Sequence, residues 1–144
     1  MINNWILLTY KLPAEPSARR VYVWRKLKRL GAITVFDAVW VLPDTPYTYE
    51  QFQWLAAEIQ ELGGEAMFWK ARAELASQEE TLIDQFQSQV EENYRSLLER
   101  MDHDLIELNA AAQEYQQIRH KDYFQCAVGL QIREKLLAAR EDPL

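Results

Sequence analysis

Apolar and polar positions in the first part of the chain follow first a strand pattern and then a helix pattern. Residues 5–10 form a short apolar run closed by Pro13, which predicts a strand buried on both faces. From Ser17, a residue type that favours N-cap positions, apolar residues recur in three-residue steps up to the stop signal Gly31. This spacing predicts an amphipathic helix whose buried stripe is Ala18, Val21, Trp24, Leu27 and Leu30.

The following residues predict two strands, a helix and a fourth strand. β-branched and aromatic residues dominate 32–36 and 38–42, which predicts two strands that meet in a tight turn or bulge at Asp37. Thr48 and Gln51 resemble a capping box, and Gly63 ends the helix marked by Phe52, Leu55, Ile59 and Leu62. Residues 65–71 then form a strand. The resulting order predicts an α+β fold, a ferredoxin-like β-α-β-β-α-β domain at residues 1–76 followed by a C-terminal helical arm.

The second part of the chain, residues 77–144, is predicted to be helical. Ser77 and Glu80 resemble a second capping box, and an apolar stripe then runs from Leu82 to Ile118 with a mean step of 3.6 residues. One straight helix of that length would extend about 60 Å, whereas a compact chain of this size has a radius of gyration of about 15 Å. Either the helix breaks, near residues 102–104, or it projects and pairs with another chain. Residues 122–129 predict a loop and 130–140 a last helix.

Both faces of the predicted sheet are apolar. Leu7 alternates with Ile6 and Leu8, and Val41 alternates with Trp40 and Leu42. Two helices of a ferredoxin-like unit cover one face, so the other face needs a cover. We therefore expect residues 77–144 to pack on the first domain or on a partner subunit, and we expect a homodimer.

Charge is distributed unevenly along this acidic chain of 144 residues, which has a net charge of −6. Residues 1–76 contain nine Lys and Arg against eight Asp and Glu, and residues 77–144 contain seven against fourteen. A field of this sign repels polyanions, so nucleic-acid binding requires a local basic patch or an oligomer that groups basic faces. The chain contains no apolar run long enough for a membrane span. Its single cysteine, Cys126, excludes an intrachain disulfide and fits a cytoplasmic protein.

The first predicted helix carries a basic patch. Six cations lie off its predicted apolar stripe, with no acidic residue nearby: Arg19, Arg20, Arg25, Lys26, Lys28 and Arg29. Such side chains can contact the phosphates of DNA, and we take these six as the candidate DNA-binding residues. An ordinary solvated helix face is the first interpretation of these charges, ahead of DNA contact, because long cationic side chains commonly coat such helices. Binding of a small oxyanion is a further alternative.

Other candidate chemistry is sparse. Glu99, His103 and Glu107 follow a four-residue spacing that could hold a divalent metal, although a solvated acidic face is the favoured interpretation. His120 reads as a helix-end charge and Cys126 as a structural residue. P-loop, dinucleotide-binding, CxxC and HExxH motifs are absent from the sequence. We therefore predict no catalytic residue, no metal and no cofactor, and no enzyme activity.

Five segments of the chain resemble a known family. The segments are WILLTYKLPAEPSARRVYVWRKLKRLGAI, VWVLPD, LAAEIQELGGEA, EENYRSLLER and IRHKDYF. In this order and spacing they resemble the N-terminal domain of the chromate-resistance regulator ChrB. The first segment resembles more weakly the domain shared by the phenylacetate repressor PaaX and the small nucleases of CRISPR adaptation. The resemblance implies a ferredoxin-like domain in a bacterial cytoplasmic protein tied to expression of a chromate efflux system.

Two departures narrow what the resemblance implies. Full-length ChrB proteins carry a second, C-terminal domain associated with the oxyanion response, and this chain stops at Leu144, so chromate is not an expected ligand. The CRISPR nucleases place an aspartate at the end of their first strand, where this chain has Tyr10 and Lys11. The hypothesis is thus a non-enzymatic, DNA-binding transcription regulator. An oligomeric protein-interaction module without nucleic-acid binding is the alternative, and a metal-dependent nuclease ranks third.

Overall fold

The computed structural model describes residues 4–141 and confirms the α+β class. The chain divides into two compact units, residues 1–81 and 82–144, each of which is described by itself. All five tryptophans lie in the first unit: Trp5, Trp24, Trp40, Trp54 and Trp69. Within the described residues, none of the helices combines the length and the apolar character that crossing a membrane requires.

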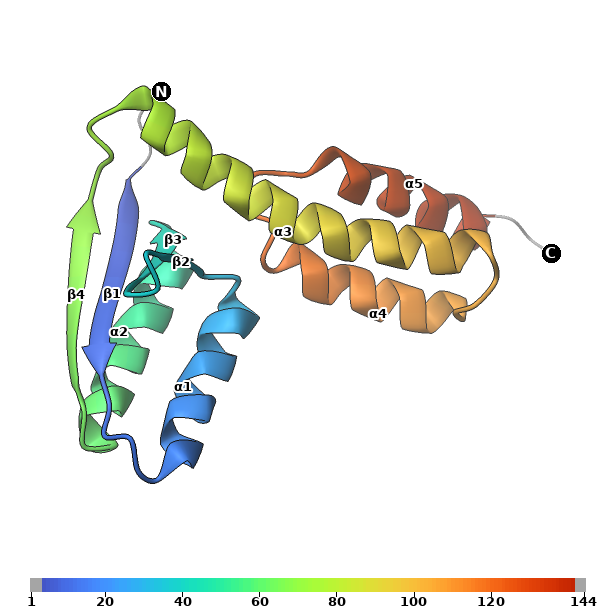
Figure 1. Cartoon of the computed structure of the whole chain (residues 1–144). Helices are drawn as coiled ribbons and strands as arrows, with labels where there is room; N and C mark the ends of the chain where they lie inside the picture. The colour runs from blue at the N-terminus through green and yellow to red at the C-terminus, as the bar shows by residue number, and fades with distance from the viewer. Residues whose placement is uncertain (1–3, 142–144) are drawn as a thin grey trace. The chain divides into compact units, whose positions relative to one another are not determined.

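The first unit is the predicted ferredoxin-like domain. Its elements in chain order are β1 (Trp5–Lys11), α1 (Ser17–Leu30), β2 (Ile33–Val35), β3 (Val39–Pro43), α2 (Pro46–Glu61) and β4 (Glu65–Ala71). The strands form one antiparallel sheet in the order β2-β3-β1-β4, and both helices lie on the same side of it (Figure 1). The β-α-β-β-α-β order predicted from periodicity is therefore confirmed.

The helix-facing side of the sheet forms the core of this unit. Phe68 of β4 packs against Tyr49 and Phe52 of α2, with ring centroids 4.9 and 6.2 Å apart. Leu8 pairs with Phe68 across β1 and β4, so it shares that face, and it is fully buried. The opposite face includes Met67 and Trp69 of β4, which are 58% and 44% exposed. What covers that face remains a prediction.

The buried face of α1 differs from the predicted one. Val23, Leu27 and Leu30 are buried, whereas the predicted stripe residues Ala18, Val21 and Trp24 are exposed. A strict three-residue step falls about 60° short of a helical turn, so a stripe built from such steps winds around the helix. Steps of four and three residues keep Val23, Leu27 and Leu30 on one side of the helix. Of these buried residues, only Leu27 and Leu30 belong to the predicted stripe.

Both predicted N-terminal caps of the first unit are wrong, while the predicted stop at Gly31 is confirmed. Pro16 occupies the N-cap position of α1 without a side-chain hydrogen bond, and Ser17 is already helical. Gly31 adopts a left-handed φ of 79°, and its N–H donates to the Lys28 carbonyl.

Helix α2 begins at Pro46, before the predicted Thr48–Gln51 box. Its N-cap is Thr45, whose hydroxyl accepts a hydrogen bond from the Thr48 N–H at 3.1 Å. In return the Thr48 hydroxyl accepts one from the Thr45 N–H at 2.9 Å. The fixed φ of proline suits the first helical position, which explains the earlier start.

The described residues after β4 form three helices: α3 (Ala76–Asp102), α4 (Leu108–Arg119) and α5 (Ala127–Glu141). Of the two alternatives for the long apolar stripe, the break near residues 102–104 is the observed one. Ser77 lies inside α3 rather than at its cap, and α5 begins at residue 127 rather than 130. The three helices run alongside one another (Figure 1) and enclose a core formed by Val90, Tyr94, Leu97, Ala111, Tyr115, Ile118, Cys126, Val128, Ile132 and Leu136.

Candidate nucleic-acid interface

The six cations predicted as DNA contacts fall into two groups on α1. Arg19 and Lys26 lie on the flank that faces α2. The Arg19 guanidinium donates a hydrogen bond to the carbonyl of Leu62, the C-cap residue of α2, at 2.8 Å. Lys26 forms an ion pair with Glu58 of α2, with 2.7 Å between Nζ and Oε1. These two cations join the helices to each other.

Glu58 is the centre of this contact. Its second carboxylate oxygen accepts a hydrogen bond from the Tyr22 hydroxyl, and the Lys26 ammonium lies 5.1 Å from the centroid of the Tyr22 ring. Burial alone would raise the pKa of Glu58, but the hydrogen bonds from Lys26 and Tyr22 lower it overall. The hydrogen bond that Lys26 donates to Glu58 in turn raises the pKa of Lys26. Both groups are therefore held in their charged forms, and the sequence reasoning missed the role of Glu58.

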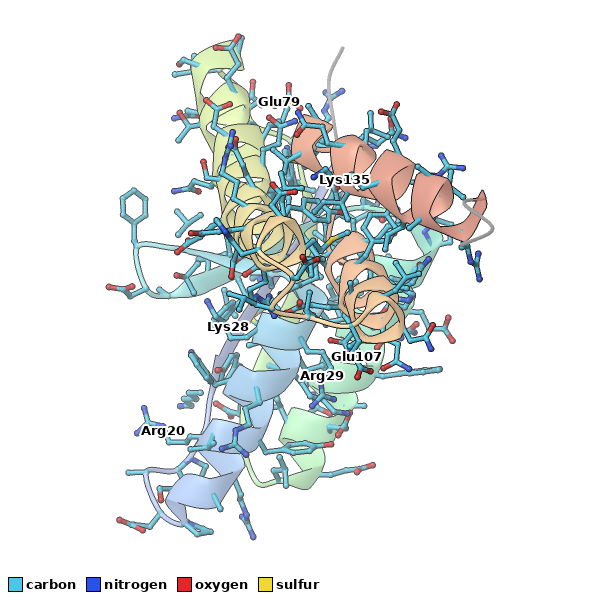
Figure 2. All side chains as sticks on the ribbon, turned by 90° about the vertical axis from the view of Figure 1, so that its right-hand side faces the viewer. Arg20, Lys28, Arg29, Glu79, Glu107 and Lys135 are labelled. Atoms are coloured by element: carbon cyan, nitrogen blue, oxygen red, sulfur yellow. The ribbon has the colours of Figure 1, made fainter. Side chains whose placement is uncertain are left out.

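The other four cations form no ion pair with α2. Arg20, Arg25, Lys28 and Arg29 are exposed, and none forms an ion pair with a residue in the described part of the chain. Figure 2 shows Arg20 and Lys28 on one side of α1 and Arg29 on the other. We call these four residues the outer cations. They spread positive charge around the outer half of the helix, and no acidic residue occurs between positions 16 and 36 to offset it.

Apolar side chains lie among the outer cations. Trp24 is 51% exposed, and the Lys28 ammonium lies 5.8 Å from the centroid of its ring. Val21 is exposed on the same part of the helix. An exposed aromatic ring beside arginine and lysine is typical of surfaces that bind nucleic acids, where bases stack and phosphates pair with cations.

Arg20 also acts on the end of β1. Burial raises the pKa of Tyr10, and a hydrogen bond with Trp40 and the charge of Arg20 lower it in part. This is the strand end where the CRISPR nucleases place an aspartate, and here it carries a phenol and a lysine.

The alternative metal site in the second unit does not form. Helix α3 ends at Asp102 and Glu107 is the N-cap of α4, so Glu99, His103 and Glu107 do not share a helical face. Among residues 4–141, the structure brings together no three His, Cys, Asp or Glu side chains that could hold a metal. Cys126 is buried in the helical core, as expected for a structural residue.

Comparisons with known proteins relate the chain to one family. The sequence model of the family described as "Protein ChrB, N-terminal" matches residues 20–121. A curated relative, Protein ChrB of Cupriavidus metallidurans, is 30% identical over 96 residues. The match covers 67% of this chain and 26% of that relative, so the chain spans about a quarter of its length. No solved structure matches. The matched region includes most of α1 and extends through α4.

Proposed function

This chain belongs to the ChrB N-terminal family, and we propose that it regulates chromate resistance. In this proposal the protein is not an enzyme and binds DNA through α1. The observation that carries the proposal is the set of four outer cations. Arg20, Arg25, Lys28 and Arg29 are exposed and unpaired within the described residues. On a convex helix they suit the phosphates of a duplex better than a small oxyanion, which a concave site would enclose.

The family and the charge pattern support DNA as the partner. The chain as a whole is acidic, so attraction to DNA must come from a local surface. Arg19 and Lys26 already pair with groups of α2, so we assign the DNA contacts to the outer cations alone. A role in transcription also places the protein in the bacterial cytoplasm. The proposal does not include chromate as a ligand of this chain.

The test is the salt dependence of DNA binding by the double variant Arg25→Gln/Arg29→Gln. We expect binding to duplex DNA from the region upstream of the gene to weaken at least about tenfold at low salt. The slope of log K against log salt should decrease by about two, one unit for each phosphate contact that is lost. Fluorescence anisotropy with labelled duplexes measures both quantities.

The matched control is Lys11→Gln/Lys70→Gln, which removes the same charge from the sheet. Both lysines lie at exposed positions of the sheet, where they form ion pairs with Glu65 and Asp44. This variant should bind DNA with the parent affinity and slope. If the two double variants lose affinity equally, the effect is one of net charge and α1 is not the interface.

We also propose a homodimer. Strand β4 is an edge of the sheet, because it pairs only with β1. An edge strand presents unpaired backbone groups, and β4 adds exposed Met67 and Trp69 on the face away from the helices. Two copies joined through this region would present two basic helices to one duplex.

A further inference from the structure

The second unit contains a groove that no part of the proposed DNA-binding function uses. It lies between α4 and α5 and has a volume of about 610 Å³. A second hollow of about 440 Å³ adjoins it and shares Tyr115, Arg119 and Arg133. Volumes of this order are typical of sites for small organic molecules. The groove lies wholly within one compact unit.

The arginines of this unit that form no ion pair all line the groove. Arg95 and Arg100 pair with Glu91 and Glu114. The three other arginines of the unit, Arg119, Arg133 and Arg140, make no ion pair within the described residues, and all three line the groove. In a unit that contains twelve Asp and Glu against seven Lys and Arg, three guanidinium groups without an ion pair at one site are available to an anion.

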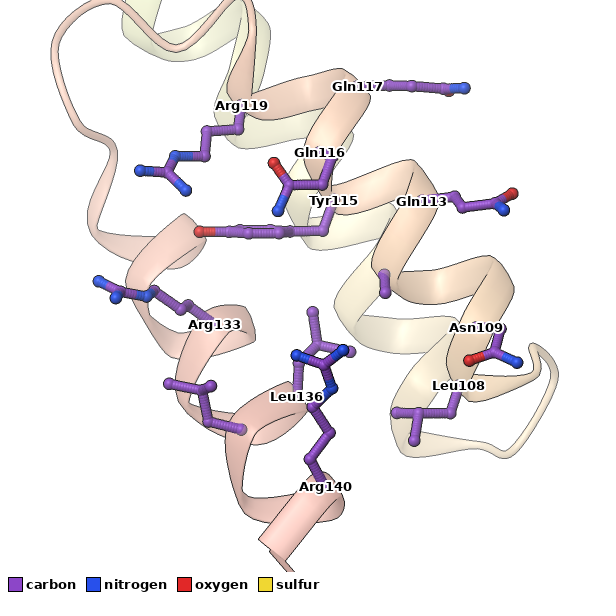
Figure 3. A pocket seen from close by; sticks show the side chains of 12 residues that line it. Leu108, Asn109, Gln113, Tyr115, Gln116, Gln117, Arg119, Arg133, Leu136 and Arg140 are labelled. Atoms are coloured by element: carbon purple, nitrogen blue, oxygen red, sulfur yellow. The ribbon is translucent and has the colours of Figure 1, made fainter.

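Side-chain directions support this interpretation. Figure 3 shows Tyr115 reaching from α4 toward α5, with Arg119 and Arg133 on either side of its hydroxyl end and Arg140 directed back between the helices. The carboxylate of Asp122 lies in the adjoining hollow, but it already accepts hydrogen bonds from the Tyr94 hydroxyl at 3.0 Å and from the Cys126 N–H at 3.0 Å. Asp122 forms no ion pair with Arg119 or Arg133.

The remaining lining is mixed: four residues are apolar, and the others include the amides of Asn109, Gln113, Gln116 and Gln117. Leu108, Ala112, Leu136 and Leu137 form the part of the groove away from Arg119. A phosphodiester backbone or an inorganic oxyanion would leave these side chains without a partner. Arginine binds a carboxylate or a phosphate through two parallel hydrogen bonds, and an apolar surface favours a hydrocarbon body.

From this combination we propose that the α4–α5 groove binds a small amphipathic organic anion, with its carboxylate or phosphate on Arg119 and Arg133 and its apolar body along Leu108 and Leu136. This ligand site is separate from the outer cations of α1. The groove proposal is independent of the DNA-binding proposal, because the groove residues and the outer cations have no residue in common.

The experiment is a calorimetric titration of the full chain with 2-naphthoate and with its uncharged analogue 2-naphthamide. We expect naphthoate to bind and naphthamide to bind at least tenfold more weakly. Arg119→Gln and Arg133→Gln should each weaken naphthoate binding about tenfold, as expected for the loss of a charged hydrogen bond. The control Arg95→Gln also removes a charge and an exposed ion pair, but it lies on α3 outside the groove and should leave the affinity unchanged.

Several results would overturn the proposal. Equal affinity for naphthoate and naphthamide would exclude a role for the arginines, and inorganic phosphate binding as tightly as naphthoate would exclude a role for the leucines. Displacement of naphthoate by a short DNA duplex would make the groove part of a nucleic-acid interface. Absence of naphthoate binding up to millimolar concentration, with the helical circular dichroism signal intact, would exclude the site altogether.

Discussion

At the level of single residues, Glu58 of α2 accepts hydrogen bonds from both Tyr22 and Lys26 of α1. These bonds hold its pKa below the ordinary value despite the cost of burial. A carboxyl group whose pKa is lower in the folded than in the unfolded chain stabilises the fold above its ordinary pKa. That stabilisation disappears as the pH falls through the folded pKa.

We therefore predict that Glu58→Gln lowers the free energy of unfolding by about 1 kcal/mol at neutral pH, as for other partly exposed charged contacts. The difference between variant and parent should shrink as the pH falls through the lowered pKa of Glu58, because the parent carboxylate then becomes protonated as well. Urea denaturation at several pH values measures this. The control Glu61→Gln changes an exposed carboxylate one turn further along α2, which no described cation pairs with, and should show no such difference.

At the level of elements, α5 approaches α3 closely at Gly129. A Cβ atom at this position would lie 2.7 Å from two ring carbons of Tyr94, a side chain that is fully buried in the helical core. The Tyr94 ring is also fixed by its hydrogen bond to Asp122, so it has little freedom to move aside. Glycine here permits the contact between the two helices.

Replacement of Gly129 by alanine should destabilise the protein, although alanine in place of glycine usually stabilises a helix. In an exposed helix, alanine is more stable than glycine by about 1 kcal/mol. Gly129→Ala should instead destabilise the protein by about 1–3 kcal/mol, because the added methyl group overpacks the core. Thermal unfolding followed by far-UV circular dichroism provides the measurement. Ala138→Gly, at an exposed position of α5, controls for propensity alone; a Gly129→Ala protein more stable than the parent would contradict the close contact.

The order of strands and helices was predictable from the sequence, because the spacing of apolar residues differs between the two and is set by neighbouring positions. Gly31 and the break at residues 102–104 were predictable for the same reason, since a glycine stop and a short polar segment act within one turn. The buried side of α1 was not predictable from three-residue steps, because Val21, Val23 and Trp24 are all apolar and only packing selects Val23. Both caps lie before the predicted residues: Pro16 rather than Ser17 is the N-cap of α1, and Thr45 rather than Thr48 is the N-cap of α2.

The sequence predicts that α1 presents a basic surface. It does not predict which of the cations bond to α2 and which are outer cations. Arg19 bonds to Leu62, which is 43 residues away, and Lys26 bonds to Glu58, which is 32 residues away. Such pairings depend on how α2 lies against α1, and one sequence does not specify that. The arginine groove had no sequence signal either, because Arg119 and Arg133 lie on different helices and flank a turn.

At the level of the whole molecule, positive charge and exposed apolar surface occupy different parts of the first unit. The outer cations lie on α1, whereas Met67 and Trp69 lie on β4, on the side of the sheet away from the helices. A dimer formed through β4 would therefore leave both copies of α1 available to DNA. This separation makes dimer formation and DNA contact independently testable.

We predict that the parent is a dimer in solution and that Trp69→Lys yields a monomer, because a lysine ammonium would lose its hydration in an apolar contact. Trp54→Lys is the matched control: Trp54 is 56% exposed on α2, outside the predicted contact, and its replacement should leave the dimer intact. Light scattering coupled to size-exclusion chromatography gives the mass of each protein. A monomeric parent, or two variants with the same mass as a dimeric parent, would show that β4 is not the contact.

The confinement of all five tryptophans to the first unit has an optical consequence. Indole emission from this protein arises only there, and Trp24 emits from a half-exposed position beside Lys28. A nucleic acid that stacks on or approaches α1 therefore alters the light that the chain emits. A ligand between α4 and α5 contacts tyrosine but no tryptophan. The tryptophan fluorescence of the unmodified chain therefore reports on binding at α1, whereas the groove between α4 and α5 contains no tryptophan to report on its ligand.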